Sequence, residues 1–504
     1  MFDALFVGLS TAFELHNLLY VVLGCFIGTF IGMLPGLGPM TAIALMIPVT
    51  YSIGPSSGLI LMAGVYYGAI FGGSTSSILI NAPGVAGTVA TSFDGYPMAQ
   101  QGYAGKALAI AAYASFTGGT IGALMLMVAA PTLAKLSLSF QSGDYVVLML
   151  LGLTAIAAFS NRGDFLKAMM MTLFGLCLAT VGIDPFSGSE RFTFNQPDLL
   201  DGISFLLIAM STFALSEALI NVIKPSGKTG TEQTSTGDIG STKLSRAEVK
   251  EMAPVVGRSS LLGFIIGVLP GAGATIASFM AYGTERNLAK GKQRSAFGKG
   301  SIRGVAAPES ANNAACTGSF VPLLTLGIPG SGTTAIMLGA LVAYGIQPGP
   351  TLMQDNPAVF WSVIVSMYFG NIVLLILNLP LIPYFAKALA LPKTILTVMI
   401  LFFSLIGVYL VSFNIFDLYL MVGFSAIALV LRLLAFPMAP LLLGFILGGM
   451  IEQNFRRAML ASDGSIAFLW ERPLTLGILL LAIAVLAIPL IDFIRQRRAT
   501  PVTA

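Results

Sequence analysis

Long runs of apolar residues follow one another along most of the chain. They cover residues 18–33, 55–80, 106–130, 144–159, 165–185, 201–223, 358–385, 394–413, 415–434, 435–450 and 473–494. A helix needs about 20 consecutive apolar residues to cross a bilayer, so this pattern predicts an all-α polytopic membrane protein with about 10–12 transmembrane helices.

Two hydrophilic segments, residues 224–258 and 284–303, interrupt the apolar pattern. Together they contain twelve of the 26 Lys and Arg residues. Because short loops rich in Lys and Arg stay on the cytoplasmic side of a membrane, we expect both segments to face the cytoplasm. The apolar stretch between them would then enter and leave on one side. Its halves, residues 261–269 and 275–282, are too short to span the bilayer, which predicts a re-entrant helical hairpin.

The break in this hairpin belongs to an internal repeat. Residues 28–38 (GTFIGMLPGLG) and 263–273 (GFIIGVLPGAG) are identical at seven of eleven positions, at an offset of 235. A second pair follows at an offset of 246, residues 81–88 (NAPGVAGT) and 327–334 (GIPGSGTT). Proline and glycine both interrupt helices, so each half of the chain has the same plan of two broken helices.

The two copies differ in the charge of their flanks. The first 105 residues contain no Lys or Arg, so the hairpin at residues 28–50 is expected to open away from the cytoplasm. Five apolar runs separate the hairpins, and an odd number of crossings inverts the second copy. Inverted repeats with paired broken helices are typical of secondary transporters, which bind substrate between the repeats near the membrane midplane.

This organisation divides the chain into four parts. We expect an N-terminal transmembrane repeat at residues 1–223, a cytoplasmic hydrophilic linker at 224–258, a C-terminal transmembrane repeat at 259–494 and a basic cytoplasmic tail at 495–504. The sequence does not distinguish a rocking motion of the two repeats from an elevator-like slide.

Composition narrows the class further. Apolar residues make up 56% of the chain and charged residues only 10%, against about 25% in soluble domains, so a lipid bilayer must solvate most of it. A net charge of +4 offers no basic stripe for nucleic acid. One histidine and three separate cysteines make a metal site or a nucleophile–base pair improbable, so we expect neither an enzyme nor a metal or organic cofactor.

Five motifs occur in order along the chain: GMLPGLGP at 32–39, YYGAIFGGS at 66–74, NAPG at 81–84, PESANNA at 308–314 and GIPGS at 327–331. Together they resemble the large membrane subunit of the tripartite tricarboxylate transporter family, the TctA-type permeases. The resemblance covers nearly the whole chain. It departs at Ala82, where the family implies a larger apolar residue, so the pocket is expected to have a different shape.

The resemblance implies a function and a set of partners. It implies a multi-pass subunit of the bacterial inner (cytoplasmic) membrane that imports small carboxylates, such as citrate, driven by a Na⁺ or H⁺ gradient. The implied partners are a small membrane subunit and a periplasmic solute-binding protein that delivers the substrate. Whether the subunit works as a dimer stays open.

The breaks themselves suggest how a carboxylate could be bound. An unpaired carboxylate is costly to dehydrate, yet the broken-helix motifs contain no Lys or Arg. Helix N-termini supply free N–H groups and partial positive charge instead. The expected substrate-binding residues are Pro35, Gly36, Gly38, Thr41, Ser74, Asn81, Pro83, Gly84, Thr88, Pro270, Gly271, Gly273, Thr275, Pro329, Gly330, Ser331, Thr333 and Thr334. In the alternative interpretation, the glycines only permit tight helix packing.

Glu309 is the candidate for ion coupling, because an acid inside an apolar stretch is by default a functional hypothesis. On a helix, Glu309, Asn312 and Asn313 share one face, and they could carry a proton or coordinate Na⁺. In the alternative, Glu309 caps a helix near the cytoplasmic interface and pairs with Arg303. Asp94 is expected in an extramembrane loop.

Two other functions stay open at this point. Rings of fixed charge along a pore would favour an anion-selective channel. A non-catalytic membrane scaffold subunit is the other alternative, and it would leave the four matched breaks without a role.

Overall fold

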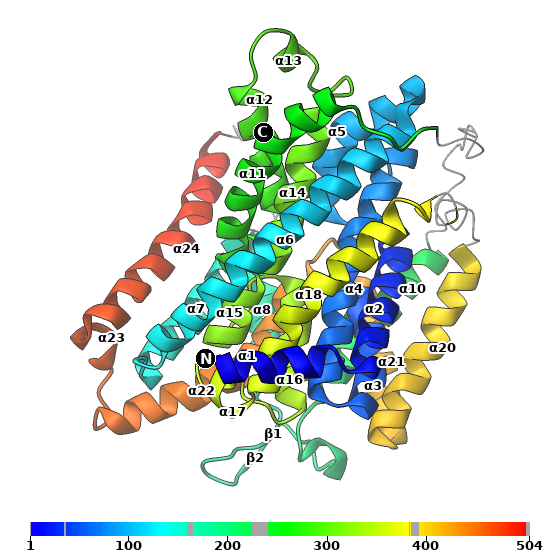
Figure 1. The fold of residues 1–504 in the computed structure, drawn as a ribbon. Coiled ribbons are helices and arrows are strands. Elements are labelled where there is room, and N and C mark those ends of the chain that lie inside the picture. The colour runs from blue at the N-terminus through cyan, green and yellow to red at the C-terminus, as the bar shows by residue number, and fades with distance from the viewer. Residues whose placement is uncertain are drawn as a thin grey trace, which may run out of the picture.

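The computed structural model describes residues 2–34, 37–158, 165–223, 240–382, 384 and 393–499. These residues are almost entirely helical (Figure 1), and the strands among them form one short antiparallel ribbon, β1 (Gly182–Ile183) with β2 (Glu190–Arg191). Eight of the described helical segments are long and apolar enough to cross a membrane. The prediction of an all-α polytopic membrane protein is confirmed.

From here on, the first and second repeats are the helices of each half that carry the matched breaks. The first repeat follows a short helix, α1 (Phe2–Ala12). It contains α2 (Leu15–Met33), α3 (Gly38–Ile53), α4 (Pro55–Ile80), η1 (Ala86–Thr88), α5 (Val89–Met98), η2 (Ala99–Tyr103) and α6 (Ala104–Ser137). The second repeat contains α11 (Arg246–Val268), α12 (Gly273–Leu288), α13 (Lys292–Ser295), α14 (Ile302–Gly318), α15 (Phe320–Leu326), α16 (Gly332–Ala343), α17 (Leu352–Asp355) and α18 (Pro357–Asn378).

The remaining helices pack around these two repeats. After the first repeat come α7 (Ser142–Ala158), α8 (Phe165–Leu178), η3 (Pro197–Leu199), α9 (Phe205–Ala209), η4 (Met210–Leu215) and α10 (Ser216–Ile223). After the second come α20 (Lys393–Ser412), α21 (Ile415–Leu433), α22 (Met438–Ala461), α23 (Phe468–Glu471) and α24 (Pro473–Ala499).

The two hairpins, α2–α3 and α11–α12, open toward opposite ends of the molecule. In Figure 1, α1, which leads into α2, lies near the lower end, whereas α13, which follows α12, lies at the upper end. The upper end carries the basic segment between α12 and α14. The second copy of the hairpin is therefore inverted relative to the first, as the charge of the flanks predicts.

Glycines at matching positions bring equivalent helices into contact. A Cβ added at Gly28 of α2 would lie 2.3 Å from the carbonyl oxygen of Val65 on α4. A Cβ added at Gly263 of α11 would lie 2.2 Å from the carbonyl oxygen of Ala311 on α14. The next glycine of each helix, four residues further on, makes the same approach at 2.2 Å. The glycines are related by the offset of 235 and the residues they contact by the offset of 246. The two repeats therefore pack this pair of helices in the same way.

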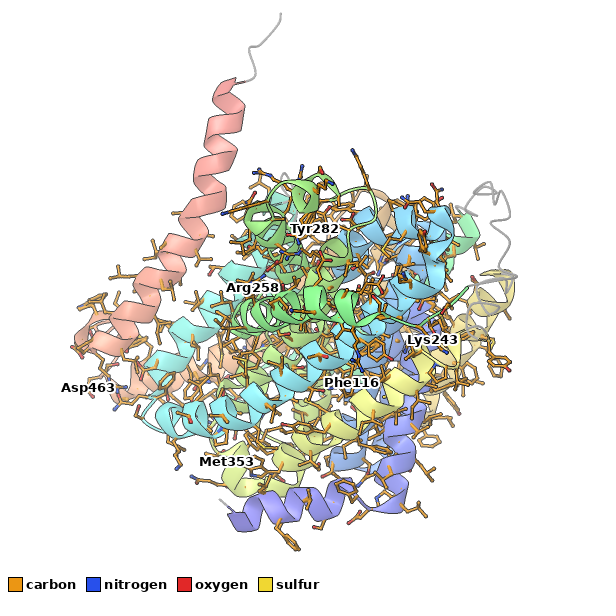
Figure 2. All side chains as sticks on the ribbon, turned by 45° about the horizontal axis from the view of Figure 1, so that its top comes forward. Phe116, Lys243, Arg258, Tyr282, Met353 and Asp463 are labelled. Atoms are coloured by element: carbon orange, nitrogen blue, oxygen red, sulfur yellow. The ribbon has the colours of Figure 1, made fainter. Side chains whose placement is uncertain are left out.

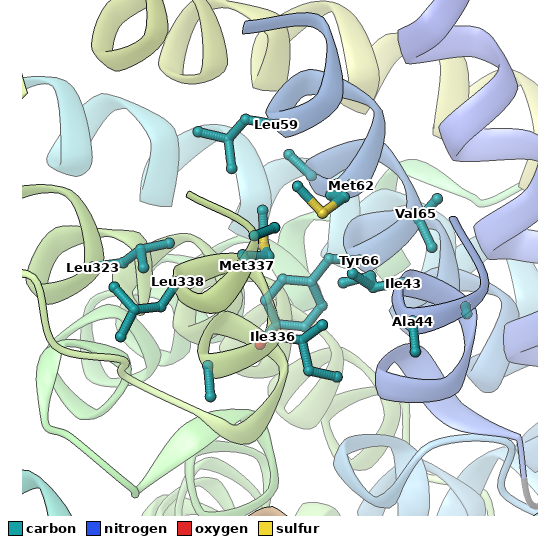
Figure 3. Close-up of a cluster of buried hydrophobic side chains, with 14 of the residues drawn as sticks. Ile43, Ala44, Leu59, Met62, Val65, Tyr66, Leu323, Ile336, Met337 and Leu338 are labelled. Carbon is teal, nitrogen blue, oxygen red and sulfur yellow. The ribbon is translucent and has the colours of Figure 1, made fainter. Parts of the chain in front are cut away.

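The buried core lies where the repeats meet. Figure 3 shows Met62 and Tyr66 of α4 beside Ile336 and Met337 of α16, with Leu323 of α15 nearby. All five are at most 2% exposed. Because α4 belongs to the first repeat and the other two helices to the second, apolar packing holds the two copies together around the broken helices.

Two expected boundaries differ from the structure. α11 begins at Arg246, so the second half of the expected linker 224–258 continues the hairpin helix, and residues 224–239 lie outside the described residues. The reason is local: Ser245 and Glu248 form a reciprocal capping box that starts a helix in a polar sequence. Likewise, α24 extends to Ala499, so the described part of the basic tail is helical.

Candidate functional site

Four interruptions of the membrane helices form two matched pairs. We call residues 34–37 and 269–272 the first and second hairpin breaks, and residues 81–85 and 327–331 the first and second helix breaks. Pro35 and Gly36, expected to bind substrate in the first hairpin break, lie outside the described residues.

The hairpin breaks have the same backbone geometry wherever both are described. Leu34 has φ −85° and ψ 115°, and Leu269 has φ −75° and ψ 121°. Gly38 and Gly273, which begin the next helices, both have a φ of +59°. This left-handed φ disfavours residues with a Cβ, which explains why both copies have glycine there.

The helix breaks match as closely. Asn81, the residue after α4, has φ 51°, and Gly327, the residue after α15, has φ 68°. In both copies the N–H of the following residue donates to a carbonyl oxygen six residues earlier, at 3.4 Å from Ala82 and 3.2 Å from Ile328. A left-handed residue is a common helix end, and asparagine tolerates this conformation better than most residues.

The breaks of the second repeat meet each other, and the first repeat, around Ser331. The N–H of Gly271 donates to the carbonyl oxygen of Gly330 at 3.0 Å, which joins the second hairpin break to the second helix break. The Tyr66 hydroxyl, from α4, lies 3.4 Å from Ser331 Oγ. A Cβ added at Gly273 would lie 3.8 Å from Ser331 Cβ.

Contacts between helix starts complete this junction. A Cβ added at Gly332, at the start of α16, would lie 2.9 Å from Met40 Sδ on α3. A Cβ added at Gly87 of η1 would lie 3.3 Å from Ala274 Cβ on α12. We call this region the repeat junction: Met40, Tyr66, Gly87, Gly271, Gly273, Ala274, Gly330, Ser331 and Gly332. It contains no Lys or Arg, so backbone and hydroxyl dipoles dominate its electrostatics.

The helix starts at the repeat junction differ in how their N–H groups are used. α3 and α12 begin without a side-chain cap, so no N-cap side chain accepts from their first-turn N–H groups. At α16 the N–H of Thr334 donates to Ser331 Oγ at 3.3 Å, and the N–H of Ser331 donates to Thr334 Oγ1 at 2.9 Å. The Ser331 and Gly271 amides are thus already bonded within the protein, although we expected both breaks to present them.

The other residues expected at the substrate site have varied surroundings. Thr41 Oγ1 donates to the carbonyl oxygen of Phe213 at 3.3 Å, and Thr88 Oγ1 to that of Val85 at 2.9 Å, so both hydroxyls support the fold. Gly84 is so closely packed that an added Cβ would lie 1.8 Å from the Gly32 carbonyl oxygen. Pro329 and Thr333 are buried, Pro83, Pro270 and Thr275 are half-buried, and Asn81 is exposed.

Glu309 lies in the third turn of α14 and is fully buried. Ser74 Oγ and Ser115 Oγ donate to its Oε2 at 2.6 and 2.8 Å, and Thr91 Oγ1 donates to its Oε1 at 2.5 Å. These hydroxyls come from α4, α6 and α5 of the first repeat, whereas Glu309 belongs to the second. Ser74, expected at the substrate site, is therefore a partner of the ion-coupling candidate.

The alternative role for Glu309, a cap paired with Arg303, is wrong. Arg303 Nε lies 3.4 Å from Glu251 Oε1, and its Nη1 lies 4.0 Å from Glu285 Oε2. Ser301, not Glu309, caps α14, accepting from the N–H of Gly304 at 3.3 Å. The charge of Arg303 is therefore neutralised by carboxylates of the α11–α12 hairpin.

Asn312 and Asn313 continue the polar face of α14. Asn312 Nδ2 donates to the carbonyl oxygen of Gly87 in η1 at 3.2 Å, which ties Asn312 to the repeat junction. Asn313 Nδ2 donates to Asn312 Oδ1 at 2.7 Å and to the carbonyl oxygen of Glu309 at 3.0 Å. Within the described residues, Asn313 Oδ1 is buried and has no hydrogen-bond partner. This oxygen can therefore coordinate a cation or accept a hydrogen bond.

Ser74 and Ser115, which donate to the Glu309 carboxylate, also line a small cavity of about 10 Å³ together with Asn378 of α18. Within the described residues, Asn378 Oδ1 is buried and has no hydrogen-bond partner. The volume of this cavity is close to the ~10–15 Å³ that one water requires. The surroundings of Glu309 therefore combine a carboxylate, hydroxyls and free amide oxygens.

Asp94 is a structural residue that sequence reasoning assigned wrongly to a loop. It lies on α5 and is fully buried. Its Oδ1 accepts the N–H groups of four successive residues, 298–301, at 2.8–3.1 Å, and its Oδ2 accepts the Tyr282 hydroxyl at 2.9 Å. Figure 2 shows Tyr282 at the end of the molecule that carries α13. One carboxylate thus fastens the basic segment of the second repeat onto the first.

Comparison with known proteins identifies the family. Residues 18–443 match the tripartite tricarboxylate transporter TctA family. The chain is 42% identical over 492 residues to an uncharacterized 52.8 kDa protein in the TAR-I ttuC' 3' region of Agrobacterium vitis, covering 98% of this chain and 97% of that protein.

A second relative from the same organism is shorter. An uncharacterized protein in the TAR-II ttuC' 3' region is 44% identical over 236 residues, which are 47% of this chain and 97% of that protein. No solved structure matches the chain. Because the family match covers most of the chain, and a full-length relative shares more than two fifths of its residues, this chain belongs to the tripartite tricarboxylate transporter TctA family.

Proposed function

We propose that this chain is the translocating subunit of a secondary-active uptake system for small carboxylates. One observation carries the proposal: broken helices from two inverted repeats meet at a repeat junction that contains no Lys or Arg. Uncapped starts of α3 and α12 supply N–H groups and partial positive charge there, which suits an anion. Membership of a transporter family agrees with this chemistry.

In this proposal the chain lies in a bacterial inner membrane with its basic end in the cytoplasm. The segment between α12 and α14 carries four Lys and Arg residues, which supports that orientation. The α2–α3 hairpin then enters from the opposite side and α11–α12 from the cytoplasm, both re-entrant. A periplasmic binding protein delivers a carboxylate such as citrate to the first side, and a small membrane subunit completes the complex.

We assign coupling to Glu309, with Asn312 and Asn313 beside it. A buried carboxylate held by three hydroxyls and no cationic side chain can gain a proton, or can bind Na⁺ through oxygen ligands that surround it. Asn312 contacts η1 at the repeat junction, so loading of Glu309 and occupation of the junction are physically linked. Coupling requires such a link, because a transporter must move ion and substrate together.

The experiment is uptake of radiolabelled carboxylates by the complex reconstituted in proteoliposomes with an imposed Na⁺ or pH gradient. The wild type should accumulate an acid above its external concentration only with a gradient, whereas a channel would merely equilibrate it. Glu309→Gln should abolish the dependence on the gradient. Glu251→Gln, which removes a carboxylate that pairs with Arg303, is the matched control and should retain it. Unchanged gradient dependence in Glu309→Gln would refute the assignment.

A further inference from the structure

A second, larger cavity lies away from the repeat junction. Its volume is about 830 Å³, within the ~300–1,000 Å³ typical of small-molecule sites. It is open to the surface on one side, and its walls are the turn between α6 and α7, the end of α22 with α23 and the start of α24, and the loop after α16. Figure 2 labels Asp463 and Met353, which flank this region, far from Tyr282. The cavity therefore lies at the end opposite the basic segment.

The cavity reaches the second helix break. Leu326, the last residue of α15, lines it together with Pro348 from the loop after α16. A Cβ added at Gly327, the next residue after α15, would lie 2.6 Å from the Pro348 carbonyl oxygen. The wall of the cavity is thus in direct contact with a break that forms part of the repeat junction.

One cation in this cavity is left without a partner. Of the two arginines that line it, Arg472 pairs with the fully buried Asp144, which also accepts from the Thr475 hydroxyl. The Arg457 side chain is exposed at the open side of the cavity, and within the described residues it has neither an ion pair nor a hydrogen bond. It lies one turn from Asn454, another lining residue, on the same face of α22.

The adjacent arginine, Arg456, does have acidic partners, so the lack of a partner is a property of Arg457 and not of this part of α22. Arg456 Nη2 lies 2.9 Å from Asp184 Oδ2 and 2.7 Å from Glu452 Oε1, outside the cavity. Successive residues on a helix point in different directions, so α22 directs one neutralised arginine toward the β1–β2 ribbon and one free arginine into the cavity. Glu471 also lines the cavity, and its carboxylate is unpaired in the described part of the chain.

We propose that this cavity is a second carboxylate site, in which Arg457 receives the anion before it reaches the repeat junction. This inference rests on the proposed function, since it names a step of the same transport. The guanidinium offers paired N–H donors that fit a carboxylate, and Asn454 and Gln347 add polar groups. The Glu471 carboxylate repels an anion, so removal of its charge should strengthen binding of a carboxylate.

The test uses a reporter inside the cavity. In a variant without Cys25, Cys177 and Cys316, Ala461→Cys, another residue that lines the cavity, is modified with an anionic or a cationic methanethiosulfonate reagent. Citrate, succinate and tartrate should each be tried for protection. Arg457→Gln should weaken protection about tenfold or more, because a hydrogen bond to a charged group is lost. Glu471→Gln should strengthen it, and Arg456→Gln, with the same loss of charge, should leave it unchanged.

The outcomes separate the possibilities. Protection that is equal in Arg457→Gln and the reporter variant, or absent with every acid, would overturn the proposal. Weaker protection in Glu471→Gln would also overturn it, because the cavity would then prefer a zwitterion. Protection by added phosphatidylglycerol vesicles instead of acids would make it a lipid site. If the reporter is protected but the reconstituted complex accumulates no acid, the proposed function fails while the site stands.

Discussion

Gly263 in α11 provides a direct test of the repeat architecture. A Cβ at this position would lie 2.2 Å from the Ala311 carbonyl oxygen, about 1.2 Å short of the 3.4 Å at which ordinary contact begins. The neighbouring helix cannot simply retreat. On another face of α14, a Cβ added at Gly118 of α6 would lie 2.3 Å from the Ser310 carbonyl oxygen. α14 is therefore held between two glycine contacts, at the first and second residues after Glu309.

We expect Gly263→Ala to destabilise the protein by about 1–3 kcal/mol, the usual cost of overpacking a close contact. Gly257→Ala is the matched control, because it lies on the same helix with nothing within 4 Å of an added Cβ. There the substitution should be neutral or stabilising by up to about 1 kcal/mol through helix propensity. The same chemical change should thus have opposite signs six residues apart.

Thermal unfolding measured with a thiol-reactive dye suits this comparison, because Cys25 and Cys316 are buried and react only on opening. Cys177 is exposed and supplies a constant background. Gly28→Ala, the equivalent change in the first repeat, should lower the midpoint as Gly263→Ala does. Equal midpoints for Gly263→Ala and Gly257→Ala would refute the close packing of α11 on α14.

Two further predictions concern single residues. Asp94→Asn keeps the shape of the side chain but removes the charge that holds four backbone N–H groups. Hydrogen exchange at residues 298–301 should therefore accelerate about tenfold or more, while the control Asp355→Asn should leave those amides protected. Asn81→Gly should preserve stability, since the equivalent Gly327 shows that glycine suits this left-handed position. Asn81→Val should lower the unfolding midpoint, and equal midpoints for the two variants would contradict the role of φ.

The sequence predicts the repeated parts of the fold well because their signals are local. Proline and glycine mark the breaks, and Gly28 and Gly263, at equivalent positions of the repeat, each approach a backbone carbonyl oxygen of the equivalent helix. The start of α11 was missed because its polar first turns resemble a linker until the pairing of Ser245 with Glu248 is recognised.

The polar partners could not be read from the sequence. Glu309 bonds to hydroxyls 194–235 residues away, and only the packing of α14 against three helices of the other repeat brings them together. Asp94 lies among Tyr, Gly and Pro residues that suggest a loop, and its role depends on four amides about 200 residues later. Such pairings are set by tertiary structure, and a single sequence carries no record of them.

The close agreement between the two helix breaks has a structural consequence. Each copy has nearly the same torsion angles and internal bonds, yet the start of α16 carries a capping box whereas α5 begins through a 3-10 turn without one. If the copies exchanged these helix starts, the bonds within each break would be conserved. The duplicated break can therefore precede two different helix starts without a change in its own geometry.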